Sequence, residues 1–306
     1  MSNIFKPVTR EQAKLRMALT GVSGGGKTLG ALYTAFGLTG DWEKIALIDT
    51  ERERARLYGD RTDLPEPVGA FLYAPLYPPY SVEKYIDYVR QAAEAVGTDG
   101  VVIVDSLSHA WSYEGGVLEY KDMISSLPGK NSYTAWNEAG RKQNEMINSI
   151  LSAPCHIIVT MRSKMDYALE ENDRGKMTPV KLGLAPIQRD DTEYEFDVVL
   201  NISREHIATA SKDVTFLDNF GETITPELGR RLHEWLAHGR EPEVFICADC
   251  GQRIRTSEKA TAARRAEMTQ ERFGRTLCEA CTKAAIRAQK EAGAHGGAIE
   301  NAPEKD

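Results

Sequence analysis

Short apolar runs alternate with longer amphipathic stretches along the first half of the chain. Helical periodicity marks residues 28–38, 81–96 and 132–152, and the last two of these stretches open with a serine that is placed to cap a helix. Between them lie runs that are almost continuously apolar, as buried parallel strands are, at residues 14–20, 44–50, 70–76, 100–106 and 155–161. This alternation predicts an α/β fold with a mostly parallel sheet.

The pattern becomes more polar from residue 163 and predicts a polar hairpin or loop there. Further elements are predicted as strands at 196–203 and 207–212 and a closing helix at 225–239. The expected organisation is therefore a domain over residues 1–239, a linker at 240–244, a small module at 245–289 and a tail at 290–306. The tail is small and polar in composition, which predicts disorder.

Residues 19–32, LTGVSGGGKTLGAL, place five glycines and a lysine between the first strand and the first helix. They fit the pattern G-x-x-x-x-G-K-S/T, in which backbone N–H groups cradle phosphates, the lysine reaches the β and γ phosphates and the hydroxyl ligates magnesium. The alternative is a flexible glycine turn, but the strand before it and the helix after it favour the phosphate cradle. The predicted cradle consists of Gly21, Val22, Ser23, Gly24, Gly25, Gly26, Lys27 and Thr28.

Acidic residues stand where two of the predicted strands end. Asp105 ends the run VVIVD, where it is placed to hold the shell of a magnesium ion together with Thr28. Asp49 and Glu51 end the run ALIDTE, and residues two apart on a strand share a face. We therefore expect both acids to point toward the nucleotide.

The order of these motifs, GVSGGGKT, IDTE, VIVDS and then IIVTMRSK, resembles the RecA-type ATPase core. The segments FKPVTREQAKLRMALTG, YEFDVVLNI and ASKD are more narrowly similar to phage-encoded RecA-like ATPases of the Sak type, which are implicated in single-strand annealing and recombination. The resemblance covers residues 1–239. It implies ATP and Mg²⁺ as cofactors, Glu51 as the residue that polarises the attacking water, and Lys27, Thr28 and Asp105 in their Walker roles. It also implies single-stranded DNA as a partner, a homo-oligomer, and a single-strand-binding protein or other recombination partner.

The chain departs from RecA after its fifth predicted strand. RecA has an Asn-Gln pair there, whereas this chain has Thr160 and Met161, and methionine cannot make the hydrogen bond of the glutamine. Arg162 and Lys164 come directly after this pair. They are candidate phosphate sensors, which could act across a subunit boundary as in RecA-type filaments. The alternative is that both are solvated surface charges. For His109, two interpretations stay open: contact with a ligand, or ordinary packing. The same two interpretations stay open for the tyrosines that cluster in the sequence, Tyr73, Tyr77, Tyr80, Tyr85 and Tyr88.

Composition restricts the classes of protein that remain. The 306 residues suffice for one large domain and an appendage, and no apolar run approaches the length of about 18 residues that a membrane span needs. The first residues lack the apolar region of a signal peptide, so we expect a cytoplasmic protein, of a phage-infected bacterium if the resemblance holds. The net charge of −7 gives no general attraction for nucleic acid, and residues 163–197, where RecA-like proteins carry a DNA-binding loop, are themselves acidic.

Four of the five cysteines form two C-x-x-C pairs, Cys247 with Cys250 and Cys278 with Cys281. Four thiolates in two close pairs match a tetrahedral Zn²⁺ site, with redox cysteines as the main alternative. The fifth, Cys155, precedes an apolar strand and is expected to be a buried thiol. A helix is predicted between the pairs, at residues 257–273, and another after them, at 282–292.

The cysteine module is locally basic. Residues 251–290 carry a balance of +6, so the remainder carries −13, which together give the net charge of −7. The basic residues of interest are Arg253, Arg255, Arg264, Arg265, Arg272 and Arg275. They are a candidate nucleic-acid footprint, a contact for an acidic protein partner, or a solvated face. The leading hypothesis is a Mg²⁺-dependent RecA-like ATPase on single-stranded DNA. The alternatives are a nucleotide-dependent switch or assembly factor that binds a protein partner through its zinc module and, third, a phosphotransferase to a small molecule.

Overall fold

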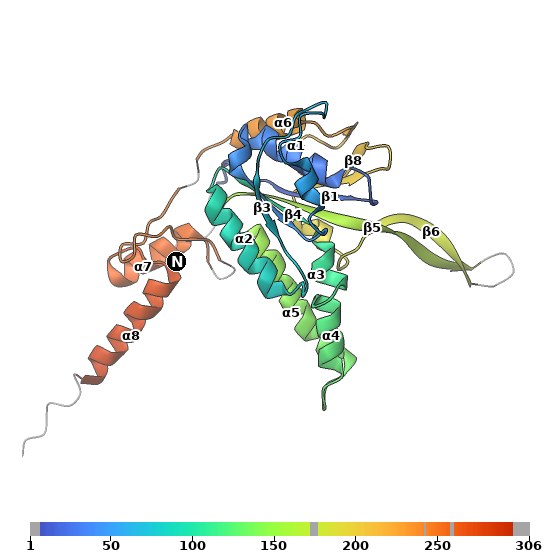
Figure 1. The fold of residues 1–306 in the computed structure, drawn as a ribbon. Coiled ribbons are helices and arrows are strands. Elements are labelled where there is room, and N and C mark those ends of the chain that lie inside the picture. Colours follow the sequence, from blue (N-terminus) through green and yellow to red (C-terminus); the bar gives the residue numbers. More distant parts are fainter. Residues whose placement is uncertain (1–6, 172–176, 242, 258–259, 296–306) are drawn as a thin grey trace, which may run out of the picture. The chain divides into compact units, whose positions relative to one another are not determined.

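The computed structural model describes residues 7–171, 177–241, 243–257 and 260–295 (Figure 1). They belong to two compact units that divide between Gly239 and Arg240. In the described part of the chain, no helix is both long enough and apolar enough to span a bilayer.

A mostly parallel nine-stranded sheet forms the centre of the first unit, in the order β3-β2-β4-β5-β1-β7-β8-β9, with β6 paired to β5. The parallel strands are β1 (Arg16–Gly21), β2 (Ile45–Asp49), β3 (Leu72–Pro75), β4 (Val101–Asp105), β5 (His156–Glu171) and β7 (Val198–Ile202). Antiparallel strands β8 (Ala208–Asp213) and β9 (Gly221–Glu222) continue one edge. The α/β fold class predicted from the alternation of apolar runs is confirmed.

Helices cover both faces of this sheet, as Figure 1 shows. On one face, α1 (Lys27–Thr39) and α6 (Pro226–Ala237) pack in one apolar core with β1 and β7. On the other face, α2 (Val82–Val96) and α5 (Ser132–Leu151) pack in a second core with β4 and β5. The chain between β4 and α5 forms two further helices, α3 (Ser108–Ser112) and α4 (Val117–Ser125), which the apolar pattern did not predict. Within the described residues, short 3-10 helices lie at Trp42–Lys44, Arg54–Tyr58 and Thr192–Glu195.

One of the two predicted serine caps is confirmed. Ser81 accepts a hydrogen bond from the backbone N–H of Lys84 and caps α2. At α5 the cap is Asn131, one residue before the predicted Ser132, because the Asn131 side chain accepts from the Thr134 N–H while Thr134 accepts in return from the Asn131 N–H. This reciprocal capping box satisfies two backbone donors at once, which a serine in the first turn could not do.

The predicted polar hairpin is also confirmed. Strand β5 continues beyond the sheet and pairs in antiparallel fashion with β6 (Met177–Pro186), with a register shift after Asp166. Residues 172–176, which include Arg174 and Lys176, lie outside the described residues. The hairpin therefore grows directly from the strand that carries Arg162 and Lys164.

The second unit contains α7 (Ala262–Phe273) and α8 (Glu279–His295). Helix α7 starts five residues later than predicted, because Thr261 accepts from the Arg264 N–H and caps it there. Helix α8 reaches His295, so the segment 290–295 is helical although its composition predicted disorder; the Lys, Glu and Ala residues there favour a helix once one has started. The rest of the predicted tail, residues 296–306, lies outside the described residues.

Candidate active site and a neighbouring pocket

The glycine loop between β1 and α1 adopts a backbone that requires glycine. Gly21, Gly24 and Gly26 have φ angles of 149°, 81° and 94°, in the region that side chains rarely enter. A Cβ atom on Gly21 would also overlap the carbonyl oxygen of Ile202 on the neighbouring strand β7. The local chemistry thus explains why this turn consists of glycines, and α1 begins at its end with its N-terminal N–H groups facing the loop.

Lys27 is folded over this loop. Its Nζ donates hydrogen bonds to the carbonyl oxygens of Gly21 and Val22, at 2.9 and 2.8 Å. Burial lowers the pKa of the lysine, and the charges of Asp105 and Glu51 partly oppose this effect. The site therefore holds one buried ammonium group that is bound to two carbonyl oxygens. An anion in the pocket can take the place of these oxygens as its hydrogen-bond partner.

Asp105 ends β4 beside the loop and is buried. The Thr28 hydroxyl donates to its Oδ2 at 2.6 Å, and the Thr160 hydroxyl donates to its Oδ1. Burial raises the pKa of this carboxyl, and the two threonine hydroxyls work against that rise. Two adjacent hard oxygen ligands on a desolvated carboxylate and a hydroxyl fit a small divalent cation such as Mg²⁺.

Asp49 does not point toward the nucleotide, contrary to the expectation from strand alternation. Its Oδ1 accepts from the N–H of Glu51, and its Oδ2 accepts from the N–H of Ala55 and the hydroxyl of Tyr73. The strand ends at Asp49, so the alternation stops there and the carboxylate satisfies the free N–H groups of the following turn. Asp49 shapes the turn that carries Glu51.

Glu51 forms a two-point ion pair with Arg162. The Arg162 Nε donates to Glu51 Oε1 at 2.7 Å and the Nη2 donates to Oε2, while Ser106 also donates to Oε1 at 3.2 Å. Burial alone would raise the pKa of Glu51, but the hydrogen bonds and charge of Arg162 outweigh burial and hold it below the ordinary value. The glutamate is thus ionised and restrained at once.

Arg162 reaches this position because β1 and β5 pair in register, with Arg162 beside Gly21. Its Nη1 also donates to the Tyr113 hydroxyl at 2.6 Å. Lys164, the other candidate sensor, is exposed and is not among the residues that line either described pocket. The structure therefore brings Arg162 to the site and leaves Lys164 outside it.

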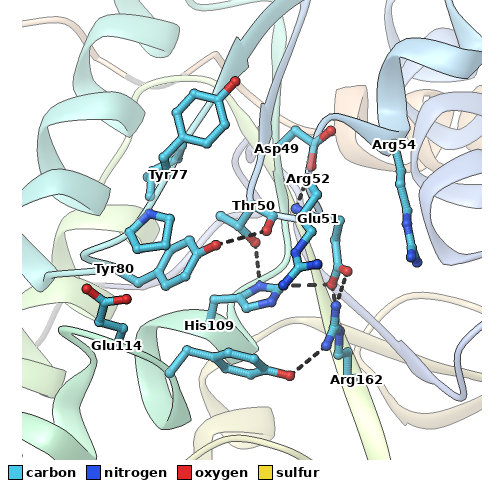
Figure 2. Close-up of a pocket in the computed structure, with 13 residues that line it drawn as sticks. Asp49, Thr50, Glu51, Arg52, Arg54, Tyr77, Tyr80, His109, Glu114 and Arg162 are labelled. Atoms are coloured by element: carbon cyan, nitrogen blue, oxygen red, sulfur yellow. Dashed lines mark hydrogen bonds and ion pairs between the residues drawn. The ribbon is translucent and has the colours of Figure 1, made fainter.

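His109 lies beside Glu51 (Figure 2). Its Nδ1 is 2.6 Å from the Thr50 hydroxyl and 3.2 Å from the Ser106 hydroxyl, and 3.9 Å from Glu51 Oε1. Burial lowers its pKa to about 4 despite the charge of Glu51. Neutral His109 is thus a buried residue that contacts the Thr50 and Ser106 hydroxyls and lies next to Glu51.

The nucleotide-sized pocket over the glycine loop has a volume of about 700 Å³. Besides the loop, Lys27, Thr28, Glu51 and Asp105, its walls include residues of four stretches that the motifs did not single out, in α1 and around residues 58–61, 206 and 225. They include Tyr33, Tyr58, Arg61, His206 and Thr225. His206 approaches the loop itself, with its Nδ1 3.1 Å from the Gly25 carbonyl oxygen.

A second pocket, of about 550 Å³, adjoins the first and shares Glu51, Arg54 and Arg162 with it. We call it the tyrosine pocket, after the three tyrosines in its wall, Tyr77, Tyr80 and Tyr113. Tyr80 and Tyr113 flank His109, with ring centroids 5.0 and 4.2 Å from the imidazole.

The other tyrosines of the sequence cluster serve packing: Tyr85 is fully buried, and Tyr73 binds Asp49.

In the second unit, the Sγ atoms of Cys247, Cys250, Cys278 and Cys281 lie within 4.8 Å of one another. The Cys250 and Cys278 sulfurs are 3.8 Å apart, close to the roughly 3.8 Å between thiolates around a tetrahedral Zn²⁺ with Zn–S bonds of about 2.3 Å. Burial tends to raise the pKa of Cys247, but N–H groups of Cys278, Cys250 and Asp249 lower it to about 6. This cluster is suited to a metal ion such as zinc.

The basic face of this unit is partly neutralised within it. Arg264 pairs with Glu267, Arg265 with Glu279, and Arg275 with Asp249. Arg272 lies over the Phe273 ring. Cys155, in the first unit, is buried as expected.

A glycine loop between a strand and a helix, a lysine folded on it, and a threonine paired with a buried strand-end aspartate define the class of P-loop nucleoside triphosphatase domains. Residues 13–225 match a family model described as an AAA domain, and the chain belongs to that family. The comparison with curated proteins gave no significant match.

Proposed function

We propose that this protein is a magnesium-dependent, RecA-like ATPase that acts on single-stranded DNA in phage-type recombination or annealing. The observation that carries the ATPase part is the convergence of Lys27, the Thr28–Asp105 pair and Glu51 on one pocket over the glycine loop. These side chains come from three segments, the start of α1, the turn after β2 and the end of β4, and each has the chemical type that phosphoryl transfer to water requires.

Lys27 and the loop N–H groups bind the β and γ phosphates, for which Lys27 exchanges its two carbonyl partners. Thr28 and Asp105 would hold Mg²⁺, and the ion supplies charge neutralisation at the phosphates when it is bound. Glu51 takes the proton of the attacking water. Its lowered pKa keeps the carboxylate ionised at neutral pH, the form that accepts a proton, while the pairing with Arg162 that lowers the pKa also weakens it as a base until Arg162 moves away.

Arg162 acts as a phosphate sensor in this proposal. It is held by Glu51 and Tyr113, and a γ-phosphate in the first pocket offers the guanidinium a stronger anionic partner. Movement of Arg162 to the phosphate releases Glu51 for catalysis. Lys164 contributes only if a neighbouring subunit of a homo-oligomer presents its own site there.

The DNA part rests on the β5–β6 hairpin, which extends from the same strand as Arg162, and on the resemblance to Sak-type proteins. Strand β5 carries Arg162 and continues into the hairpin, so one strand would connect the nucleotide to a surface for a partner. The recombination role, a single-strand-binding partner and a homo-oligomer belong to the same proposal. We also propose that the four cysteines bind one Zn²⁺, since their convergence on one point suits a metal better than a two-cysteine redox pair.

The test is the steady-state ATPase rate with and without oligo(dT), in the presence and absence of Mg²⁺. We expect Mg²⁺-dependent hydrolysis that oligo(dT) stimulates. Glu51→Gln should keep nucleotide binding but lower turnover by something like 10²-fold or more, the usual scale for loss of a general base. Lys27→Ala should instead weaken binding of a fluorescent ATP analogue. Wild-type turnover by Glu51→Gln would assign the base to another residue.

A second candidate function is a slow nucleotide-dependent switch or assembly factor that binds a protein partner through the cysteine module. The observation that favours it is the ion pair that restrains Glu51. An ATPase rate that oligo(dT) leaves unchanged, together with binding of DNA that does not depend on nucleotide, would favour this function over the first.

A further inference from the structure

The tyrosine pocket lies beside the pocket over the glycine loop and touches Glu51, the proposed catalytic base. It lies against Glu51 and Arg162, and Figure 2 shows Tyr80 and His109 lining it beside Thr50. Its volume of about 550 Å³ falls within the range of about 300–1,000 Å³ that is typical of sites for small organic groups.

Aromatic rings form one wall of the tyrosine pocket, and the pocket has room for a further ring beside them. Tyr113 is 37 % exposed and Tyr77 is 53 % exposed, whereas Tyr80 behind them is buried. The Tyr113 ring contacts His109 on one side, and the Arg162 guanidinium lies 5.6 Å from its centroid. An exposed tyrosine face beside a guanidinium is the environment in which proteins stack a nucleobase.

Two arginines at the rim supply positive charge. Arg52 and Arg54 are exposed, and neither forms an ion pair with a carboxylate within the residues that the structure describes. The charge of Arg52 acts on the pocket, since it contributes to lowering the pKa of His109. Arg52 also has a φ angle of 59°, a left-handed backbone that costs free energy in a non-glycine residue and is concentrated at functional sites.

The acidic residues of the pocket are largely engaged elsewhere. Asp49 accepts from two backbone N–H groups and a tyrosine, and Glu51 is paired with Arg162. Glu114, at the exposed edge, is the remaining carboxylate of the lining. The positive groups that stay available for a ligand therefore outnumber the negative ones at the rim.

We infer that the tyrosine pocket binds one nucleotide of a single-stranded DNA, with the base on the Tyr113 face and the phosphate at Arg52. This inference rests on the proposed action on single-stranded DNA and names where one nucleotide meets the ATPase site. Because Arg162 bonds to both Tyr113 and Glu51, a base or phosphate in this pocket changes the partners of Arg162. The pocket thus gives DNA a direct route to the catalytic glutamate.

The first experiment uses the wild-type chain, photocrosslinked to oligo(dT) that contains 5-iododeoxyuridine and mapped by mass spectrometry, with and without MgATP. We expect crosslinked peptides that contain Tyr77 or Tyr113. If the wild-type chain binds oligo(dT) and every crosslink maps to the hairpin or the cysteine module, this inference is wrong while action on DNA stands.

The second experiment measures the affinity for oligo(dT) by fluorescence anisotropy over a range of salt concentrations. Tyr113→Ala should weaken binding by roughly 10-fold, the scale of one stacked base, whereas Tyr113→Phe keeps the ring and should bind like the wild type. Arg52→Gln should reduce the salt slope by about 0.7, the effect of one lost phosphate contact on a single strand. The matched control is Arg56→Gln in the same turn, which lies outside both pockets and pairs with Glu53.

Each remaining outcome separates the two proposals. A wild-type chain that does not bind oligo(dT) at any salt concentration contradicts the proposed function, and this inference with it. Unchanged affinity in Tyr113→Ala and Arg52→Gln overturns only the inference. If these variants instead lose self-association in sedimentation velocity and keep DNA affinity, the pocket is a contact between subunits and the inference is equally overturned.

Discussion

Glu51 and Arg162 stand 111 positions apart in the sequence and yet determine each other's ionisation. The arginine lowers the pKa of the glutamate, and the glutamate raises the pKa of the arginine, although burial works against both charges. An ion pair of this kind keeps each side chain ionised and also hydrogen-bonded to the other. Breaking the pair can therefore change the maximal ATPase rate and the pH dependence of that rate separately. The maximal rate shows whether the catalytic base is present, and the pH at which the rate falls gives the pKa of that base.

The first prediction uses that separation. In the variant Arg162→Gln, burial is no longer outweighed, so the pKa of Glu51 should rise toward and above its ordinary value. Because the ionised carboxylate is the active form in the proposed mechanism, the acid limb of the profile of kcat/KM against pH should move to higher pH. The measurement is that profile between pH 4 and 8 for the wild type and the variant.

Lys164→Gln is the control for this prediction, since Lys164 is exposed on the same strand and lies outside the lining of both pockets. Its acid limb should coincide with that of the wild type. An acid limb that stays in place in Arg162→Gln would mean that Glu51 does not govern the rate.

The packing of α1 against α6 depends on two glycines that meet between the helices. Cβ atoms on Gly37 and Gly229 would overlap backbone atoms of the opposite helix, including the carbonyl oxygens of Pro226 and Thr34. The helices are therefore in backbone contact, which places the start of α1 firmly beneath the glycine loop. Glycine here is required for close approach, and its φ angle is not in the left-handed region.

The second prediction compares two glycine-to-alanine substitutions within helices. Gly37→Ala should lower the free energy of unfolding by about 1–3 kcal/mol, because the added methyl group forces the helices apart. Gly140→Ala in α5, where the nearest atom to a Cβ is the Arg189 Nη1 at 4.0 Å, should raise it by about 0.5–1 kcal/mol through helix propensity. Chemical denaturation of both variants measures the difference. Equal effects in the two variants would contradict the packing argument.

The elements that the sequence predicted well are those with a strong period or a fixed motif. Continuous apolar runs located the central strands, and the spacing of the glycines before Lys27 and Thr28 located the phosphate loop. Both patterns are local in the sequence. Asp49 was predicted wrongly, since the alternation of a strand says nothing about a turn whose N–H groups need an acceptor. Tyr113 and Arg162 meet only through the pairing of distant segments, so no local pattern could join them.

At the scale of the whole molecule, the chain contains two units with separate apolar cores. The core of the second unit is small, with Cys247, Ile254, Ala266 and Leu277 as its buried members. A unit of this size buries too little apolar surface to be stable without a further link such as a disulfide or a metal. The four cysteines of this unit form no disulfide in the structure, and the zinc ion proposed above would supply the missing link.

The third prediction follows from that difference between the two cores. The purified protein should contain about one equivalent of zinc, and a chelator that binds zinc but leaves Mg²⁺ free should unfold the second unit, because metal binding and folding are one equilibrium in such modules. The first unit has its own large core and no thiolate ligand to a metal among its described residues, so its thermal transition and ATPase rate should persist. Calorimetry with and without the chelator checks both parts. Cys250→Ser should lose the zinc, whereas the matched variant Cys155→Ala removes a buried thiol of the first unit and should retain it. A zinc-free chain whose second unit still melts cooperatively would show that the four cysteines do not need a metal to fold.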